Sequence, residues 1–308
     1  MASIDSDSRD EGIALEPAPR VAYAAVAAGA RTHFRRFTAF QRWVHFFIMC
    51  SFTVLVFTGM PLKYSDQGWA QWEMRLLGGV QSAGIIHRFA ALIMVTCVLC
   101  MLGFLARILI KTRGHFWGPG TMVPARQDLQ DMIGMFAWFW GKGRPQLQLD
   151  RYSYWEKFEF WAASAGVMIM CATGSMMWYP QLTTRIFPGI VLNFAIVNHS
   201  GGALLAMGFV FVFWHFFHAH LRPEVFPMDK TMFEGGLPVD EYAHERPLEY
   251  ERRVREGTLR NVLVPERSPS RRKVENFLWW TITGATLVVW AAFSLFVVWV
   301  ASFWIGSF

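Results

Sequence analysis

Charged residues are scarce in this chain of 308 residues, at 17% of the total, whereas soluble proteins average about 25%. Hydrophobic residues make up 54% of the chain and aromatic residues 16%, which excludes an ordinary soluble domain of this size. Cysteine is also rare, and Cys50, Cys97, Cys100 and Cys171 all fall in apolar stretches, so we expect no structural disulfides. Met101 follows the CxxC of Cys97 and Cys100, which excludes the CxxCH motif of covalent c-type haem.

A basic segment followed by an apolar core is missing from the N-terminus, MASIDSDSRDEG, so we expect no cleavable signal peptide. Long apolar runs are present instead, and a bilayer-spanning helix takes about 20 such residues. Five stretches qualify: Trp43 to Met60, Gly84 to Ala106, Phe158 to Trp178, Ile190 to Phe217, and Phe277 to Trp304. Because backbone groups in lipid must bond within their own segment, these stretches predict an all-α integral membrane helix bundle.

Lys and Arg residues are unevenly distributed between the predicted spans. Residues 1–42, 107–157 and 222–273 together hold 25 of them, whereas residues 60–83 and 179–198 hold 3. By the positive-inside rule, this predicts a multi-pass membrane protein with a cytoplasmic N-terminus. Since the positive charge flanks the spans, topology accounts for the pI of about 9.3, and we expect no nucleic-acid partner.

Two segments outside the spans have a pattern of their own. Residues 125–145 read ARQDLQDMIGMFAWFWGKGRP, with apolar residues at helical spacing, which predicts an amphipathic helix on the inner membrane surface; a plain connector would also fit. Residues 231–273 are charged and poor in aromatics, so we expect a solvated cytoplasmic arm.

A faint internal repeat relates the first two spans to the next two. IMCSFTVLVFTG in the first span compares with IMCATG in the third, and HRFAALIM in the second compares with HSGGALLAM in the fourth. Gly59, Gly174, Gly201 and Gly202 would let helices, or a flat cofactor, approach the backbone closely.

Histidines lie at both ends of the bundle in this topology. His45 and His215 fall near the inner face, and His87 and His199 fall near the outer face, each pair coming from two different spans. A low-spin haem iron takes two axial ligands from opposite sides, so the pattern predicts two haem b groups stacked across the membrane. Arg42 and Arg88 lie beside these histidines and are candidates for pairing with haem propionates; snorkelling at the membrane edge is the alternative.

A haem-free membrane anchor, or a histidine-based ion transport subunit, is the alternative function. A transporter would be expected to carry acidic residues or broken helices at mid-membrane, and the first, second and fourth spans carry no acidic residue.

The inner ligand on the fourth span is ambiguous between His215 and His218. On a regular helix, a partner about 14 residues beyond His199 would share its face, and that position is Phe213. His215, 16 residues beyond His199, lies at a suitable depth in the membrane, but on a regular helix its side chain would point away from the face that carries His199. We therefore predict His215 as the ligand together with a π-bulge or local unwinding near Gly201, Gly202 or Gly208.

A resemblance to a known family is carried by four segments between Arg35 and Lys230: RFTAFQRWVHFFIMCSFTVLVFTG, HRFAAL, YSYWEKFEFWAASAGVMIMCATGSMMWYP and FPGIVLNFAIVNHSGG. They resemble the cytochrome b (gamma) subunit of membrane-bound formate dehydrogenase, in a wider family with the cytochromes b of thiosulfate reductase and nickel-iron hydrogenase. The resemblance implies that His45 and His215 bind an inner haem, and His87 and His199 an outer one. The ending HFFHAHLRPEVFPMD is similar to cytochromes b that accompany multihaem c-type cytochromes or other redox partners.

The resemblance further implies a respiratory oxidoreductase subunit of the bacterial cytoplasmic (inner) membrane. It would transfer electrons between a partner, which is an iron-sulfur subunit or a multihaem c-type cytochrome, and menaquinone or ubiquinone. We expect the quinone beside the inner haem; the polar candidates there are Tyr152, Ser153, Glu156, Lys157 and His218, with a Glu156–Lys157 ion pair as the alternative. Ser153 and Trp155 stand where the family has Asn and Gly. The expected organisation is a tail (1–35), a four-helix dihaem core (36–230), the arm (231–273) and a fifth span (274–308).

Overall fold

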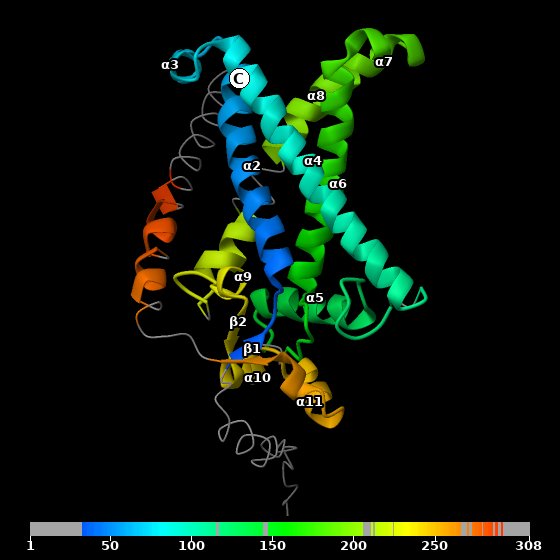
Figure 1. The fold of residues 1–308 in the computed structure, drawn as a ribbon, viewed down its shortest axis with the longest axis vertical. Helices are drawn as coiled ribbons and strands as arrows, with labels where there is room; N and C mark the ends of the chain where they lie inside the picture. Colours follow the sequence, from blue (N-terminus) through cyan, green and yellow to red (C-terminus); the bar gives the residue numbers. More distant parts are fainter. Residues whose placement is uncertain are drawn as a thin grey trace, which may run out of the picture.

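The computed structural model describes residues 33–114, 117–143, 147–205, 211, 213–223, 225–265, 270, 273–278, 280–285, 287–288 and 291. Within these residues the chain is mainly helical, with three short strands. Long helices form a bundle that stands on a smaller unit of short helices and strands (Figure 1).

Three helices are long and apolar enough to cross a membrane: α2 (Ala39–Lys63), α4 (Val80–Lys111) and α6 (Tyr154–Trp178). At 1.5 Å per residue, the 25 residues of α2 or α6 extend about 38 Å, more than the roughly 30 Å of a hydrocarbon core. They contain the first three predicted spans, which are confirmed. The chain is therefore a multi-pass, all-α membrane helix bundle.

The predicted fourth span is only partly described. It begins as α8 (Ile190–Leu205), residues 206–210 lie outside the described part, and the chain then continues as helical turns that end in the π-helix η2 (Phe217–Leu221). Of the predicted fifth span, the described residues up to 291 are helical, and the greater part lies outside the described residues.

The bundle is built from two helical hairpins. α2 packs along α4, and α6 packs along α8, as the internal repeat of the sequence predicts. At one end the hairpins carry the short helices α3 (Gly68–Leu76) and α7 (Pro180–Ile186), which Figure 1 shows at the top of the molecule. Gly78 and Gly79 join α3 to α4 with φ of 82° and 95°, a backbone region that residues with a Cβ rarely adopt.

Local sequence fixes where two of the spanning helices begin. Thr38 precedes α2, accepts from the Gln41 backbone N–H, and has its own N–H bound by the Gln41 side chain. Ser153 and Glu156 make the same reciprocal pair of hydrogen bonds at the start of α6. Such capping boxes satisfy backbone donors that the first helical turn leaves without partners.

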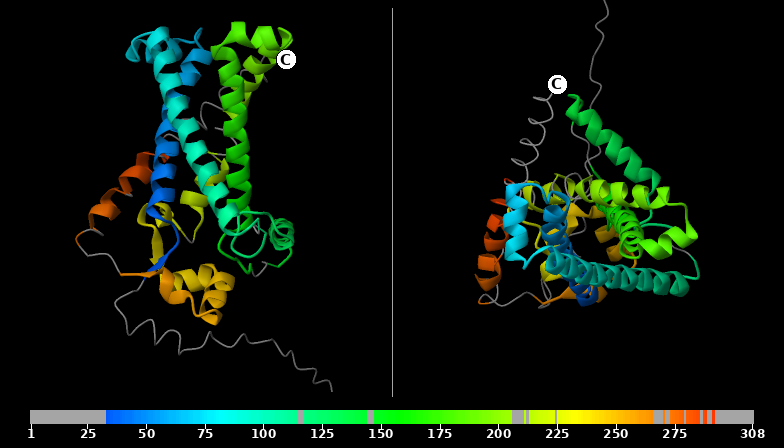
Figure 2. Two further views of the ribbon diagram at one scale, coloured as in Figure 1. Left: turned by 45° about the vertical axis from the view of Figure 1, so that its right-hand side comes forward. Right: turned by 90° about the horizontal axis from the view of Figure 1, so that it is seen from above.

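The opposite end carries a small folded unit, which we call the sheet unit. It comprises β1 (His33–Arg35), β2 (Gly236–Pro238), β3 (Leu263–Val264), α10 (Val239–Glu245) and α11 (Pro247–Arg255), with an antiparallel sheet in the order β2-β1-β3. Phe34 pairs with Leu237 on one side and with Leu263 on the other. Figure 2 shows the unit beneath the bundle.

The sheet unit corrects the expectation of a solvated arm. Its buried core consists of Phe34, Leu237, Val239, Tyr242, Tyr250, Leu259, Val262 and Leu263. Phe34 is fully buried and stacks on Tyr242 with ring centroids 3.7 Å apart. The expectation failed because the apolar residues are spread thinly among charges, and they form a core only when β1, more than 200 residues earlier in the chain, joins β2 and β3.

The predicted amphipathic helix is present as α5 (Arg126–Phe139). Leu129, Ile133 and Phe136 are exposed on it, whereas Asp128 binds Lys157 of α6 at 2.7 Å. One face of α5 is thus attached to the bundle and the other presents apolar side chains, so its position on the membrane surface stays a prediction.

Candidate functional site

Four histidines meet in two pairs inside the bundle. His45 of α2 and His215, which follows α8, have ring centroids 6.3 Å apart. His87 of α4 and His199 of α8 also have centroids 6.3 Å apart. We call His45 and His215 the sheet-end pair and His87 and His199 the far-end pair. The structure brings together the histidines that the sequence grouped by depth.

The two pairs lie at different levels of the bundle. The far-end pair contacts α2 at Thr58, 13 residues beyond His45, so the levels differ by about 20 Å along the helix axis. On α6 the far-end pair contacts Thr173 and the sheet-end pair contacts Glu159, 14 residues apart, which again corresponds to about 21 Å. The bundle therefore contains two histidine sites, one above the other.

Threonine hydroxyls orient both rings of the far-end pair. Thr58 Oγ1 lies 2.8 Å from Nδ1 of His87, and Thr173 Oγ1 lies 3.1 Å from Nδ1 of His199. Each hydroxyl donates its own proton to a backbone carbonyl one turn back, at Val54 and Ile169, both at 2.7 Å. The hydroxyl therefore accepts from the ring, so Nδ1 carries the proton and Nε2 keeps its lone pair for a ligand.

Glycines next to these threonines leave room for the rings. A Cβ at Gly59 would lie 3.1 Å from Cε1 of His87, and a Cβ at Gly174 would lie 3.1 Å from Cε1 of His199. The Thr-Gly pair of each repeat thus serves one histidine, with the hydroxyl binding the ring and the glycine admitting it. Sequence reasoning noted the repeated Thr-Gly but missed this role.

A carboxylate replaces the hydroxyl at the sheet-end pair. Glu159 of α6 binds Nδ1 of His215, and the two side chains are 20% and 37% exposed. His45 packs edge-on against Phe233, with centroids 6.5 Å apart. The proton of the His215 ring therefore faces Glu159, and its Nε2 is left for a ligand. Glu159 was not among the predicted site residues, although an acidic residue within the third predicted span was the signal.

The helix that carries His215 is distorted, as predicted. Residues 211, 213–215 and 217–221 are π-helical, with η2 ending at Leu221. Each π-type hydrogen bond spans one residue more than an α-type bond, so a π-helical turn contains more residues than an α-helical turn. The 16-residue spacing from His199 to His215 can therefore bring His215 round to face His45. Gly201 and Gly202 lie in α8, so they are not the site of the distortion, and Gly208 lies outside the described residues.

His218 and His220 have other partners. Nδ1 of His218 donates to the Trp214 carbonyl at 2.8 Å, and its ring stacks on Trp155 with centroids 5.5 Å apart. His220 is buried and donates to the Pro227 carbonyl at 3.3 Å. His215 is thus the residue of this segment that faces His45.

The two predicted propionate partners also make protein contacts. Arg42 donates to the Phe233 carbonyl beside α9 (Thr231–Glu234). Arg88 donates to the Gly84 carbonyl at 2.9 Å, and its guanidinium lies 5.5 Å from the centre of the Trp178 ring. Each arginine stands beside its histidine pair, but its pairing with a propionate stays a prediction.

Polar side chains at the start of α6 hold the bundle to the sheet unit. Glu156 binds both Arg36 and Arg246, whose side chains are 1% and 2% exposed. Lys157 binds Asp128, so the alternative interpretation, an ion pair between Glu156 and Lys157, is wrong. It fails because neighbouring residues on a helix point in different directions. Ser153 and Glu156 are also occupied in the helix cap.

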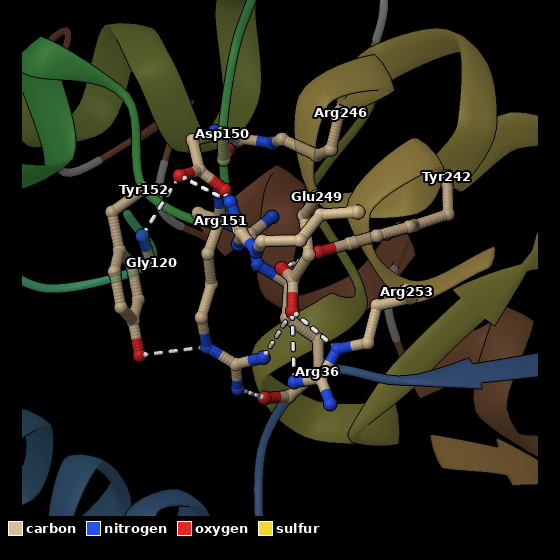
Figure 3. Close-up of polar contacts among 10 residues, drawn as sticks. Arg36, Gly120, Asp150, Arg151, Tyr152, Tyr242, Arg246, Glu249 and Arg253 are labelled. Carbon is tan, nitrogen blue, oxygen red and sulfur yellow. Dashed lines mark hydrogen bonds and ion pairs between the residues drawn. The ribbon is translucent and has the colours of Figure 1, made fainter. Parts of the chain in front are cut away.

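Further ion pairs extend this attachment (Figure 3). Glu249, 1% exposed, binds Arg151 at 3.0 Å and Arg253 at 3.1 Å, and Arg151 in turn donates to the Arg36 carbonyl at 2.6 Å and to the Tyr152 hydroxyl at 3.3 Å. Burial raises the pKa of Tyr242, whose hydroxyl donates to Glu249. Sequence reasoning missed this network because its members come from four separate segments.

The Asp150 carboxylate is a further member of this network of ion pairs. It receives two hydrogen bonds from Arg252, at 2.7 and 2.9 Å, and one from the Gly120 backbone at 2.8 Å. Burial alone would raise the pKa of Asp150, but these donors and the Arg151 backbone N–H hold it below its ordinary value.

Comparison with known proteins gives distant relatives, and no family model matches the chain. The chain is 23% identical over 176 residues to the cytochrome b556(fdo) subunit of formate dehydrogenase from Escherichia coli (strain K12), a match that covers 55% of this chain and 71% of the relative. It is 19% identical over 197 residues to the cytochrome b556(Fdn) subunit of nitrate-inducible formate dehydrogenase from E. coli K12 and from Shigella flexneri, covering 64% of this chain and 81% of the relatives. The chain is thus distantly similar to cytochrome b subunits of formate dehydrogenases.

Proposed function

We propose that this chain is the membrane cytochrome b subunit of a respiratory oxidoreductase complex, and that it conducts electrons between a redox partner subunit and the quinone pool. The observation that carries the proposal is the pair of matched histidine sites, each with ring centroids 6.3 Å apart. Two metal–nitrogen bonds of about 2.0 Å, with half an imidazole ring on each side, add up to roughly 6 Å.

The donor set fits haem b. In the part of the chain that the structure describes, no three His, Cys, Asp or Glu side chains group as metal ligands. Two imidazoles suit a group that brings its other four donors itself, as a porphyrin does. His87, His199 and His215 each have Nδ1 bound by a side chain, which leaves Nε2 for the iron. Such second contacts fix ring orientation and tautomer.

The bound haems would supply one-electron chemistry, and the chain supplies position and surroundings. His45 and His215 would hold one haem, and His87 and His199 the other, about 20 Å apart along α2. Gly59 and Gly174 keep each far-end ring close to a neighbouring helix. The 25 Lys and Arg residues in alternate loops support a cytoplasmic sheet end, and hence a cytoplasmic N-terminus.

For the quinone, menaquinone or ubiquinone, we propose a site at the sheet end, as predicted. The contacts narrow the candidates, because Ser153, Glu156 and Lys157 are occupied in a helix cap and ion pairs. Tyr152, whose hydroxyl accepts from Arg151 at 3.3 Å, and His218, stacked on Trp155 next to the start of α6, are the remaining candidates. We choose His218 for the test. His218→Phe keeps an aromatic ring there and should lower quinone-linked turnover while both haems remain. Phe217→Leu, at the exposed neighbouring position, is the control.

The test of the cytochrome proposal is a reduced-minus-oxidised absorption spectrum of the purified protein with haem counting. We expect b-type bands at two haems per chain, one haem in His215→Ala and in His199→Ala, and two in His218→Ala. Wild-type protein without b-type bands would favour the haem-free anchor or ion transport subunit. Loss of a haem in His218→Ala alone would overturn the assignment of His215.

A further inference from the structure

The two histidine pairs differ in the group that binds Nδ1. At the far end both rings are bound by neutral hydroxyls, those of Thr58 and Thr173. At the sheet end the His215 ring is bound by the carboxylate of Glu159. The two sites are alike in ring separation and differ in charge.

The position of Glu159 on α6 brings its carboxylate to the His215 ring. Glu159 lies 14 residues before Thr173, so the two residues occupy corresponding positions on α6 at the two levels of the bundle. The Glu156 carboxylate, one turn earlier, is bound to Arg36 and Arg246, whereas Glu159 contacts His215. Asp229 is a second acidic group close enough to act electrostatically on His215. The surroundings of His215 are thus more negative than those of His199.

We propose that Glu159 is a positioning residue that holds His215 and gives the sheet-end haem a lower reduction potential than the far-end haem. This inference rests on the proposed function, since it concerns the haems that the two pairs would bind. Nothing in the resemblance or in the similar proteins assigns Glu159 a role.

Two physical effects of the carboxylate act in the same direction. A carboxylate bound to Nδ1–H raises the basicity of the imidazole, and a more electron-donating ligand stabilises the oxidised metal. A negative charge near the site favours the oxidised state directly, and this effect is strong in a low-dielectric interior. Hydrogen bonding to an axial ligand is one of the means by which proteins set haem potentials.

The proposal orders the reduction potentials of the two haems, with the sheet-end haem the lower. An electron on the sheet-end haem would move toward the far-end haem with a favourable free energy, because the hydroxyl-bound pair stabilises the reduced state better. The direction of the complete reaction still depends on the quinone and on the partner at the far end.

The experiment is a redox titration of the b-type bands in Glu159→Gln. Glutamine keeps the size of the side chain and a carbonyl acceptor for Nδ1–H but removes the charge. We expect one of the two midpoint potentials to rise by at least a tenfold change in the reduction equilibrium, about 59 mV for one electron. The component that moves should be the one that disappears in His215→Ala. Asp131→Asn, which neutralises a buried acid on α5 that Gln127 binds, is the control and should leave both potentials in place.

The outcomes separate the inference from the proposed function. Wild-type protein without b-type bands would refute the proposed function. Two haems whose potentials in Glu159→Gln match those of the control would overturn the inference alone, as would a shift confined to the component that survives in His215→Ala. If Glu159→Gln loses a haem, Glu159→Asp decides, because it restores the charge. Recovery of the haem at a low potential would support the inference, and failure to recover it would overturn it.

Discussion

The far-end and sheet-end histidine pairs have equal ring separations, yet they are held by different means. The far-end pair depends on the Thr-Gly repeat, in which a hydroxyl binds each ring and a glycine admits it. The sheet-end pair depends on Glu159, on a π-helical segment and on helices attached to the sheet unit by buried ion pairs. The comparison teaches that the sequence repeat accounts for the two matching halves of the far-end pair, whereas the sheet-end pair is built from residues without a counterpart in the repeat, a carboxylate and a folded unit.

The largest effect is expected from a substitution that breaks the ion pairs between α6 and the sheet unit. Glu156→Gln leaves Arg36 and Arg246 buried without their anionic partner, and removal of one member of a buried ion pair costs about 3–5 kcal/mol. We expect the free energy of unfolding to fall by about that amount, measured by circular dichroism in detergent, and the sheet-end haem to be released first. Asp66→Asn, at an exposed position near the far end, should change little. Equal stability of the two variants would show that the ion pairs to the sheet unit do not stabilise the bundle.

The second prediction concerns the far-end pair. Thr173→Val removes the acceptor of the His199 ring proton while keeping the shape of the side chain. Loss of such an outer contact typically lowers affinity for the bound metal group by about 10–100-fold, so we expect faster loss of the far-end haem on dilution or heating. Thr53→Val is the matched control, because Thr53 makes the same backbone hydrogen bond on α2 at an exposed position. Equal haem retention in both variants would contradict the role of the hydroxyl.

The third prediction sharpens the role of the glycines. Gly166→Ala on α6 meets no atom within 4 Å, so it should stabilise the helix by about 0.5–1 kcal/mol. Gly174→Ala on the same helix gains the same propensity but places a Cβ 3.1 Å from the His199 ring, and overpacking costs about 1–3 kcal/mol. We expect the Gly174 variant to be the less stable one and to alter the far-end haem spectrum. Identical behaviour of the two variants would mean that the ring moves aside without cost.

Much of this architecture is readable from the sequence because it depends on local patterns. The long apolar runs of α2, α4 and α6 and the loop charges need no tertiary information. The conflict between the 16-residue spacing of His199 and His215 and a regular helix predicted the distortion that the π-helical turns provide.

The remaining features depend on contacts between segments far apart in the chain. The sheet unit forms only when β1 inserts between β2 and β3, which hydrophobic periodicity in residues 231–273 does not reveal. Glu159 was passed over because an acidic residue near a helix end is usually solvated, whereas here it faces His215 across the bundle. Likewise, the alternative interpretation paired Glu156 with its neighbour Lys157, whereas its partners are Arg36, which follows β1, and Arg246, which lies between α10 and α11.

The smallest expected effect is a loss of stability at the sheet end of the bundle as the pH falls. Arg252 and the backbone donors of Arg151 and Gly120 outweigh burial and keep the pKa of Asp150 below its ordinary value of 3.8. A carboxyl group with a lowered pKa in the folded state stabilises the fold above the ordinary value, and that contribution is lost as the pH falls through the folded pKa. Titration of wild-type protein from neutral pH to below 3.8 should therefore release the sheet-end haem before the far-end haem, because the threonine hydroxyls at the far end do not titrate. Asp150→Asn lacks this acid-dependent contribution, so it should be less stable than wild type at neutral pH and should approach it in acid. If the two proteins lost stability in parallel over the whole range, Asp150 would not be the group that makes the sheet end sensitive to acid.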